Sequence, residues 1–566
     1  MDIRSFYEQT RKKIANENFS ELSARGMEKP DSFNWVRDIF EPLNVQKNPN
    51  GEALIWKSES GDRRFTFKEL QEYCNRLLNF LRSRDVAKSS IIYTQLPLVP
   101  ANWISYLAAI KGGYIVIPAA TTLSDQDISY RFERSMPNVI IADKENAAKI
   151  DGALRNSPQK VDVKLITGQD KEDWINFDKA MEGEETAAKA ADTNPDDPLF
   201  YFFTSGTTGM PKVVVHTHFS YPIGHLTTAS WIGLRAGDIH YNISQPGWAK
   251  FAWSSFFAPW AMGATVFAYH SASFDAAEQL KAMQQYGITT FCAPPTALRM
   301  LIQEDLADYD YSLRQCVAAG EPLGPDIIDS WKEGTGILIR DGYGQTEATC
   351  MVANMPDTDV KFGSMGKPTF LYDIIIADEE GHKVPATETG NICLDLSEGM
   401  SAGLFKSYGQ EEGDEDKVFK NGLYYTGDKA YRDEDGYIWF VGRDDDVIKA
   451  SDYRIGPFEV ESVLSNHPAV VEAAVVASPH DLRGNVVKAF IVLSDGTSPS
   501  RELAKELFRF SEERLAVYKI PRIIEFMDEF PKTVSGKIRR VELRSKETIQ
   551  RHEGAPAEHE FFHEKY

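Results

Sequence analysis

The segment from Leu199 to His216 decides the fold, and it reads LFYFFTSGTTGMPKVVVH. An apolar run at residues 199–203 is followed by a stretch rich in Gly, Ser and Thr, and residues 213–216 are again rich in β-branched side chains. Two such runs, separated by turn-forming residues, predict two strands joined by a glycine-rich loop. Because a strand follows the loop and the spacing from Gly to Lys differs, the segment is not a Walker P-loop.

The loop has the composition of a phosphate-binding turn. Gly206 and Gly209 allow the backbone N–H groups to face an anion, the neighbouring hydroxyls add donors, and Lys212 adds a positive charge. Taken alone, the same residues are also typical of an ordinary flexible surface loop.

Around this segment, from about residue 50 to residue 400, short β-branched runs alternate with longer helical patterns. This alternation is typical of βαβ units around a parallel sheet, which bind ligands at loops after the carboxyl ends of strands. The expected strands are residues 90–95, 114–118, 138–142, 163–167, 199–203, 264–269 and 289–293, and residues 102–111 and 275–286 are expected to be helices with one apolar face.

After about residue 365 the alternation of strand and helix patterns gives way to short strand patterns. Short strands at residues 373–377 and 391–395 predict a small β-rich subdomain. From residue 446 the pattern predicts a compact α+β domain with helices at residues 457–465 and 500–515 and strands at 470–478, 487–493 and 523–527. The closing stretch, residues 552–566, is predicted to be a loosely held tail.

Composition narrows the class of protein. The 566 residues carry 62 Lys and Arg against 84 Asp and Glu, a net charge of −22, and this disfavours binding to nucleic acids or anionic membranes. The five cysteines form no C-x-x-C pair and the N-terminus has no apolar leader, so we expect a reducing, cytoplasmic location. The uncharged stretch at residues 251–269 contains Pro259 and Gly263 and is expected to be buried core rather than a membrane span.

Six further motifs follow the glycine-rich loop. They are AGEP (319–322), DGYGQTE (341–347), YTGD (425–428), GRDDDVIK (442–449), YRIGP (453–457) and PKTVSGKIRR (531–540). With these motifs in this order, the chain resembles the adenylate-forming superfamily of acyl-CoA synthetases, peptide-synthetase adenylation domains and beetle luciferases. The resemblance covers roughly residues 50 to 545, and within the superfamily the chain looks most like a medium-chain acyl-CoA synthetase.

The resemblance implies an α/β fold with two domains. A large N-terminal AMP-binding domain, residues 1–444, would combine βαβ subdomains with the small β-rich subdomain, and a small mobile α+β lid, residues 445–566, would follow a hinge at Asp445. It also implies a ligase that uses ATP and Mg²⁺ to convert a medium-chain, branched or aromatic acid into an acyl adenylate and then transfers the acyl group to CoA. Since both steps bring anions together, electrostatic stabilisation should dominate catalysis.

By resemblance, one set of residues binds ATP. It comprises Thr204, Ser205, Gly206, Thr207, Thr208, Gly209, Met210, Pro211 and Lys212 around the phosphates, Gly320, Glu321, Pro322, Asp341, Gly342, Tyr343, Gly344 and Gln345 around the adenine, Asp428 and Arg443 at the ribose, and Arg454 facing substrate or phosphate. For Asp428 the alternative is a turn-forming residue after Gly427.

Three residues are the expected catalytic group. Lys537, made mobile by the preceding glycine, would bridge the carboxylate and the α-phosphate, while Glu347, next to Thr346, would be the magnesium ligand. The alternatives are a solvated lysine in a basic patch and a surface acid at a helix N-terminus.

For CoA, the resemblance assigns Ser451, Asp452, Tyr453 and Arg483. Asp452 departs from the glycine that is commoner in the family, which puts close approach of the pantetheine arm in doubt, and Arg483 could equally form a structural salt bridge. For the acyl pocket it assigns Trp248 as a gate and Gly344, whose small size would leave room for a longer or wider acid than acetate.

Several nearby residues have more ordinary interpretations. Trp253, Phe256 and Phe257 could line the acyl pocket but are more often core packing. His216, His218 and His225 lack Cys or carboxylate partners at metal-ligand spacing, which favours structural or surface histidines.

Three rival functions use the same motifs. They are a stand-alone adenylation enzyme that loads a carrier protein, a luciferase-like monooxygenase, and a silent nucleotide-binding protein. No carrier segment is recognisable, and Lys212, Glu347, Asp428 and Lys537 are all present, so the CoA ligase is favoured. The sequence leaves the acid and the oligomeric state open.

Overall fold

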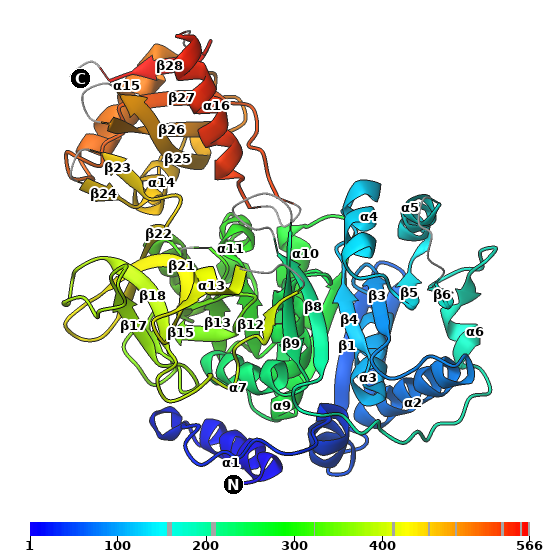
Figure 1. The fold of residues 1–566 in the computed structure, drawn as a ribbon. Helices are drawn as coiled ribbons and strands as arrows, with labels where there is room; N and C mark the ends of the chain where they lie inside the picture. The colour runs from blue at the N-terminus through cyan, green and yellow to red at the C-terminus, as the bar shows by residue number, and fades with distance from the viewer. Residues whose placement is uncertain are drawn as a thin grey trace. The chain divides into compact units, whose positions relative to one another are not determined.

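The computed structural model describes residues 1–155, 161–204, 211–321, 323–409, 414–450, 453–480, 484–533, 537–554 and 557–563. These residues form two compact units (Figure 1). The larger unit comprises the described residues up to Asp373 together with those between 396 and 417, and the smaller comprises residues 374–395 and the described residues from Val418 onward. Asp445 lies within the smaller unit, and a hinge there stays a prediction.

One sheet of the larger unit carries the loop that opened the sequence analysis. Its strand order is β19-β9-β8-β4-β3-β5-β6-β7, parallel from β8 to β7, with β9 antiparallel to both β8 and β19. The strands are β3 (Ile91–Gln95), β4 (Ile115–Pro118), β5 (Val139–Ala142), β6 (Val163–Ile166), β7 (Ile175–Asn176), β8 (Pro198–Thr204), β9 (Lys212–Thr217) and β19 (Ser407–Tyr408). The strands expected in this region are confirmed, as is the strand after the loop.

The second sheet of the larger unit has the order β16-β15-β14-β13-β12-β10-β11-β1-β2 and is parallel from β14 to β1. Its strands are β1 (Glu52–Ser58), β2 (Gly61–Thr66), β10 (Ile239–Asn242), β11 (Thr265–His270), β12 (Thr290–Ala293), β13 (Gln315–Ala318), β14 (Ile339–Gly344), β15 (Cys350–Ala353) and β16 (Lys367–Pro368). The expected strands at residues 264–269 and 289–293 are therefore confirmed.

Helices cover the faces of both sheets (Figure 1). They are α1 (Ile3–Ala15), α2 (Phe67–Ser83), α3 (Ala101–Gly112), α4 (Asp125–Arg134), α5 (Lys144–Leu154), α6 (Phe177–Met181), α7 (Ser220–Ile232), α8 (Ala249–Ala252), α9 (Ala258–Met262), α10 (Ala276–Gln285), α11 (Pro295–Leu301) and α12 (Pro325–Thr335), with π-helical segments at Val36–Val45 and Trp253–Phe257 and short 3-10 turns at Phe19–Glu21 and Leu306–Asp308. The local sequence determines where helix α4 begins. The Ser124 hydroxyl accepts a hydrogen bond from the Asp127 N–H, and the Asp127 carboxylate accepts one from the Ser124 N–H, which together form a capping box.

The prediction of one apolar face was wrong for α3. Every residue of this helix is buried, including Asn102 and Lys111, and the same holds for α7. A helix that is apolar on most sides is buried between layers rather than on the surface. Lys111 is accommodated because its ammonium donates to Glu41 at 2.5 Å and to the Asn75 side chain at 2.6 Å.

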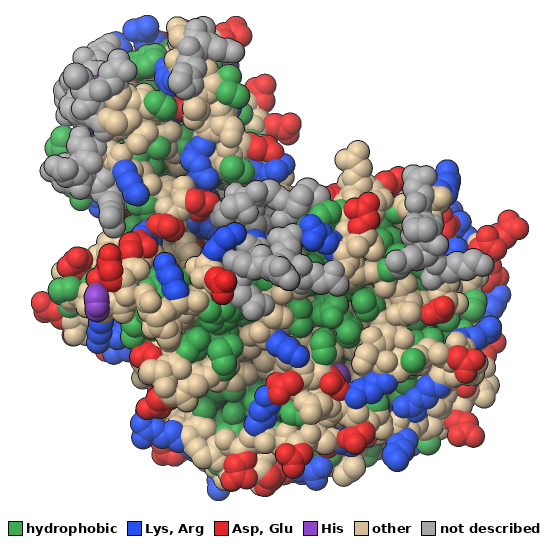
Figure 2. Space-filling model, in the orientation of Figure 1, with side chains coloured by type: hydrophobic (Ala, Val, Ile, Leu, Met, Phe, Trp, Pro, Cys, Tyr) green, Lys and Arg blue, Asp and Glu red, His purple; other side chains and the backbone are tan. Residues whose placement is uncertain are grey.

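The uncharged stretch is buried core, as expected. It forms α8, the Trp253–Phe257 segment, α9 and β11, and Phe256 and Trp260 are fully buried. Across the described part of the chain, no helix combines the length and the apolar character needed to cross a bilayer. Figure 2 shows acidic and basic side chains interspersed on the visible face.

The smaller unit contains two sheets and a strand pair. The first sheet runs β17-β18-β21-β20, with β22 on β21, and the second runs β25-β26-β27-β28. The elements are β17 (Ile374–Ala377), β18 (Gly390–Asp395), β20 (Phe419–Lys420), β21 (Leu423–Arg432), β22 (Ile438–Arg443), the pair β23 (Ile448–Ala450) and β24 (Tyr453–Ile455), β25 (Val470–His480), β26 (Gly484–Leu493), β27 (Ile523–Met527), β28 (Glu560–Phe562), α14 (Pro457–Ser465), α15 (Arg501–Glu512) and α16 (Arg540–Glu553), while α13 (Asp414–Val418) joins the units in sequence. The expected β-rich subdomain and α+β domain are confirmed.

The prediction of a loose C-terminal tail was wrong for residues 557–563. Strand β28 pairs antiparallel with β27, and the buried Glu560 carboxylate accepts from Lys488 Nζ at 2.6 Å. The same ammonium donates to Glu525 at 2.6 Å and to Glu547 at 2.5 Å. The tail is therefore attached to the domain by a buried ionic cluster, whose carboxylates are each paired with a cation.

Candidate active site

The two ends of the glycine-rich loop are fixed opposite each other. β8 and β9 pair antiparallel with Thr204 opposite Lys212, so the loop is the connection of a hairpin. Residues 205–210, which include Ser205, Gly206, Thr207, Thr208, Gly209 and Met210 of the expected phosphate loop, lie outside the described residues. A phosphate-binding role for this loop therefore stays a prediction.

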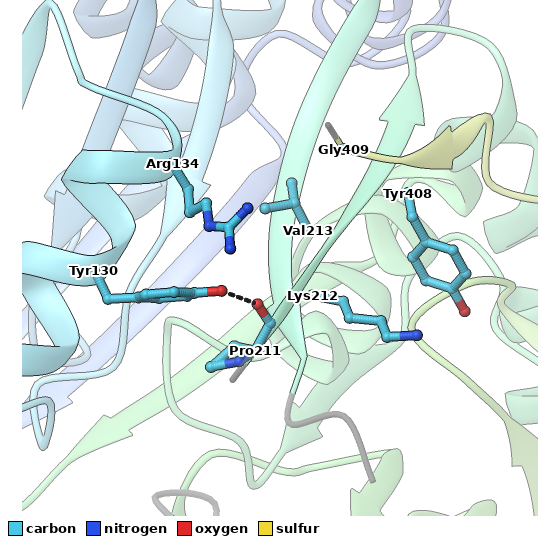
Figure 3. A pocket seen from close by; sticks show the side chains of 7 residues that line it. All are labelled: Tyr130, Arg134, Pro211, Lys212, Val213, Tyr408 and Gly409. Carbon is cyan, nitrogen blue, oxygen red and sulfur yellow. Dashed lines mark hydrogen bonds between the residues drawn. The ribbon is translucent and has the colours of Figure 1, made fainter. Parts of the chain in front are cut away.

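A small pocket opens beside Lys212. It is lined by Tyr130, Arg134, Pro211, Lys212, Val213, Tyr408 and Gly409 (Figure 3). On one side the Tyr130 hydroxyl, from α4, donates to the Pro211 carbonyl at 2.9 Å and so fixes the end of the loop. On the other side Lys212 extends toward Tyr408, and its ammonium lies 5.2 Å from the centre of the Tyr408 ring, within cation–π distance.

Glu347 is held in place through its side chain and its backbone. The Tyr408 hydroxyl donates to Glu347 Oε1 at 2.9 Å, and the Phe405 N–H donates to the Glu347 carbonyl at 2.7 Å. The neighbouring Thr346 carbonyl is 2.7 Å from His216 Nε2. A carbonyl can only accept, so His216 carries its proton on Nε2, and burial lowers the pKa of His216 to about 4, which keeps it neutral.

None of the three histidines is on the surface, so of the two ordinary interpretations only a structural role remains, and it stays a prediction. His216, His218 and His225 are each fully buried, and burial lowers the pKa of all three. Sequence reasoning missed the role of His216 at the Thr346 backbone and missed Tyr408 altogether. No local pattern could have revealed Tyr408, because its partner Glu347 is 61 residues away in the chain.

The expected adenine-binding residues lie at the carboxyl ends of β13 and β14. Asp341 Oδ1 accepts the Gly342 N–H at 2.9 Å, and burial raises the pKa of Asp341 to about 8, so the carboxyl group largely keeps its proton at neutral pH. The Thr296 hydroxyl contacts both oxygens of the Glu321 carboxylate, at 3.0 and 2.9 Å. Gly320 has φ +107°, a conformation that favours glycine, and Pro322 lies outside the described residues.

Two glycines of β14 lie against tryptophans. A Cβ on Gly342 would be 2.6 Å from Trp231 Cε2, and a Cβ on Gly344 would be 2.8 Å from Trp253 Cη2 and 2.1 Å from the Thr349 carbonyl oxygen. The space that Gly344 leaves is thus taken by the Trp253 indole. Residues two apart share one face of a strand, so both indoles lie on the same face of β14.

A lysine lies between these two indoles. The Lys250 ammonium is 4.9 Å from the Trp231 ring and 5.7 Å from the Trp253 ring, and it donates to the Ser254 hydroxyl at 3.0 Å. The Trp231 indole N–H is buried and has no hydrogen-bond partner among the described residues. This face of β14 therefore combines aromatic surface with hydrogen-bond donors.

The other aromatic residues of the predicted acyl region divide into two groups. Phe256 and Phe257 are fully buried and contact Trp35, so they are core packing. Trp248 is half-buried at the edge of the core of the first sheet. Next to it, Gly247 has φ +97° and approaches the Ala119–Ala120 backbone so closely that a Cβ would be 2.4 Å from Ala120 N.

In the smaller unit, Asp428 and Arg443 are opposite each other on β21 and β22. Asp428 is buried, and its N–H donates to the Thr426 hydroxyl at 3.2 Å. Next along β21, the buried Lys429 ammonium lies 3.0 Å from Asp444 and 3.1 Å from Glu379. The register therefore places the two residues opposite each other on adjacent strands, with the Asp428 side chain buried and the Arg443 side chain exposed.

Asp445 and Lys537 also lie in this unit. Asp445 is 3.7 Å from both Arg443 and Arg544, yet burial and the adjacent Asp446 raise the pKa of Asp445. Lys537 is exposed, and its N–H donates to the Thr533 hydroxyl at 3.1 Å, while its carbonyl accepts the Thr533 N–H at 2.7 Å. These two bonds hold Thr533 and Lys537 next to each other.

The expected CoA residues are only partly described. Ser451, Asp452 and Arg483 lie outside the described residues, and Tyr453 and Arg454 are described as backbone of β24. Their assignment to CoA and substrate therefore stays a prediction.

Comparison with known proteins gives a consistent result. Residues 43–408 match the family described as AMP-binding enzyme, and residues 459–537 match the AMP-binding enzyme C-terminal domain. The chain is 47% identical to 4-hydroxybutyrate–CoA ligase 1 of Metallosphaera sedula over 94% of this chain and 93% of that protein. It is 40% identical to the mitochondrial acyl-coenzyme A synthetase ACSM3 of Mus musculus over 92% of each.

Solved structures agree. The anthranilate CoA ligase AuaEII in complex with anthranoyl-AMP superposes with a TM-score of 0.84 at 31% identity, over 92% of this chain and 99% of that one. A benzoate CoA ligase from Burkholderia xenovorans LB400 gives a TM-score of 0.77 at 28% identity, over 90% of this chain and 100% of that one. The chain therefore belongs to the AMP-binding enzyme family and is an AMP-forming acyl-CoA synthetase, a ligase that joins a carboxylic acid to CoA through an acyl adenylate.

Proposed function

We propose that the acid activated by this ligase is a medium-chain, branched or aromatic carboxylic acid, and that acids with an oxygen at the far end are included. The observation that carries the proposal is the Lys250 ammonium between Trp231 and Trp253 on the glycine face of β14. Aromatic faces favour an apolar acyl chain, and a half-buried ammonium gains from an oxygen acceptor. The 47% identical relative is named for 4-hydroxybutyrate, an acid of this kind.

The proposal is tested with a panel of acids ranked by kcat/KM. Acetate, butyrate, 4-hydroxybutyrate, hexanoate, 2-methylbutyrate and benzoate are incubated with ATP, Mg²⁺ and CoA, while pyrophosphate, AMP and acyl-CoA are followed. We expect acetate to rank last, because its single methyl group has the least apolar surface to bury against aromatic side chains. In Lys250→Met the preference for 4-hydroxybutyrate over butyrate should fall, whereas the exposed-site control Lys281→Met should keep it; an unchanged preference in Lys250→Met would refute the role of the ammonium.

For ATP, the proposed roles follow the chain order of the site. Lys212 and the loop before it hold the phosphates, Tyr343 and Glu321 contact the adenine, and Asp428 with Arg443 holds the ribose. The support is that Lys212 directly follows the hairpin loop and that Asp428 and Arg443 are opposite each other in register. CoA binding by Ser451, Asp452, Tyr453 and Arg483 is proposed from the sequence alone.

Mg²⁺ is proposed as the metal, with Glu347 and Thr346 as the residues that would hold it. Carboxylate and hydroxyl oxygens are the donors that Mg²⁺ prefers, and the Glu347 carboxylate is oriented by a hydrogen bond, as metal-binding carboxylates usually are. When bound, the ion would neutralise charge on the phosphate oxygens. Glu347 would supply the negative charge that attracts the ion.

The chemistry of the first step assigns Lys537 its role. A carboxylate oxygen attacks the α-phosphorus, the bond to the bridging oxygen of pyrophosphate breaks, and pyrophosphate leaves with the electron pair. The exposed Lys537 would stabilise the negative charge shared between carboxylate and phosphate. In the second step the CoA sulfur attacks the acyl carbon and AMP leaves.

We further propose the domain boundary at residues 444 and 445, with Asp445 as the hinge. The support is that Asp445 contacts two arginines at 3.7 Å, Arg443 before it in the chain and Arg544 in α16, so its carboxylate has two alternative partners. A cytoplasmic location is proposed as well, in keeping with the five cysteines, which are all buried and unpaired.

A further inference from the structure

Tyr408 connects two proposed ATP-binding residues that come from different elements. Its hydroxyl donates to Glu347 Oε1 at 2.9 Å, and its ring lies 5.2 Å from the Lys212 ammonium. Lys212 begins β9, whereas Glu347 lies in the turn between β14 and β15. A single aromatic side chain thus contacts both the positive and the negative group at the end of the phosphate loop.

The backbone around Tyr408 is fixed to the same two elements. β19 pairs with β9, so that Tyr408 is opposite Val214, and the Gly409 N–H donates to the Val213 carbonyl at 2.8 Å. Three residues before Tyr408, the Phe405 N–H donates to the Glu347 carbonyl at 2.7 Å. Main-chain hydrogen bonds on both sides of Tyr408 therefore fix its backbone.

The contacts of Tyr408 restrict the orientations of the Glu347 carboxylate and the Lys212 ammonium. The Glu347 side chain has three rotatable bonds, and a hydrogen bond to an ionised carboxylate is stronger than a neutral one, so the Tyr408 hydroxyl selects one orientation. The π face of the ring attracts the Lys212 ammonium, so one side chain contacts both charged groups. We propose that Tyr408 is a positioning residue that holds the Glu347 carboxylate and the Lys212 ammonium in the arrangement needed to bind Mg²⁺ and ATP phosphates together.

The inference rests on the proposed magnesium role of Glu347, and its test separates the two. Glu347→Gln, Tyr408→Phe and Tyr408→Leu are compared with Tyr7→Phe, which also loses one tyrosine hydrogen bond, from a buried hydroxyl to the Pro222 carbonyl at 2.9 Å. One readout is the Mg²⁺ concentration that gives half-maximal ATP–pyrophosphate exchange. The other is the shift in unfolding temperature caused by ATP with Mg²⁺, relative to ATP with EDTA, which requires no turnover.

In Tyr408→Phe we expect the half-saturating Mg²⁺ concentration to rise roughly tenfold, with exchange at saturating Mg²⁺ close to that of the wild type, since loss of a hydrogen bond to a metal ligand weakens binding of the metal. The Mg²⁺-dependent part of the unfolding shift should shrink in parallel. Tyr408→Leu should additionally raise the ATP concentration needed, because the ring under Lys212 is lost. Tyr7→Phe should match the wild type in both readouts.

Two results would overturn the inference, and only the second would also overturn the proposed magnesium role of Glu347. If Glu347→Gln changes the Mg²⁺ dependence but Tyr408→Phe stays within twofold of the wild type, the positioning role of Tyr408 is wrong and the magnesium role stands. If neither variant changes the Mg²⁺ dependence, the proposed magnesium role is wrong as well. Should Tyr408→Leu fail to fold, Tyr408→Phe, which keeps the ring, still decides between these results.

Discussion

Replacing Gly344 with alanine should destabilise the larger unit and impair catalysis through the same contact. The new Cβ would lie 2.1 Å from the Thr349 carbonyl oxygen and 2.8 Å from Trp253 Cη2. The oxygen belongs to the backbone next to the start of β15, where Gly344 is paired with Cys350, so relief requires the two strands to separate by about 1 Å. Overpacking of a closely packed site costs about 1 to 3 kcal/mol, and we expect the upper half of that range, because the main obstacle is backbone.

The assay is urea unfolding followed by tryptophan fluorescence, with Gly152→Ala as the matched control. Gly152 lies within α5, and a Cβ there would meet nothing closer than the Asp125 carboxylate at 3.2 Å, so this change should be neutral or stabilising by up to about 1 kcal/mol. In the same preparation, kcat/KM of Gly344→Ala for the longer acids should fall, since Trp253 must move. A loss of stability below 0.5 kcal/mol, which is about the experimental error, would show that Gly344 is not in close contact and refute the reasoning.

Three further outcomes are expected. Lys537→Ala should lose adenylation by roughly a thousandfold but keep thioester formation from supplied acyl adenylate; an equal loss in both half-reactions would contradict an adenylation-specific role. Asp445→Pro should leave pyrophosphate release measurable and slow the consumption of CoA, and unchanged CoA consumption would rule out the hinge. Burial raises the pKa of Asp341 from its ordinary value of 3.8 to about 8 in the folded state. The protonated carboxyl group therefore stabilises the protein at low pH, and this contribution is lost as the pH rises toward 8. Asp341→Asn should thus gain stability over the wild type between about pH 5 and pH 8, and parallel stability profiles of the two proteins would refute the raised pKa.

The sequence predicted well those features that depend on neighbouring residues. The strands at residues 138–142 and 523–527 and the helix at 457–465 were recognised because periodicity and turn residues act over a few positions. For the same reason, Thr204 and Lys212 were identified as the ends of one loop. The structure pairs Thr204 with Lys212 on adjacent antiparallel strands, as a short connection between two strands predicts.

Features that depend on distant residues could not be predicted. Helix α3 was expected to have a solvent face, but Lys111 is buried because Glu41 and Asn75 surround it. Tyr408 gave no signal, because a tyrosine before an acidic loop becomes informative only when Glu347 is known to be adjacent. Such contacts depend on topology rather than on local pattern.

The wrong prediction for C-terminal residues 557–563 also results from contacts with distant residues. A stretch rich in Glu and His normally indicates a solvated tail, because an unpaired carboxylate is costly to bury. Here Glu560 is buried because Lys488, 72 residues earlier, provides one ammonium for three carboxylates, and Arg551 and Lys546 contribute further positive charge at Glu560 and Glu525. Removing Lys488 would leave these carboxylates without their shared partner, a change that costs far more than one surface ion pair. The order of the chain end is thus decided by a residue on β26, and this explains why the composition of the end itself gave the wrong prediction.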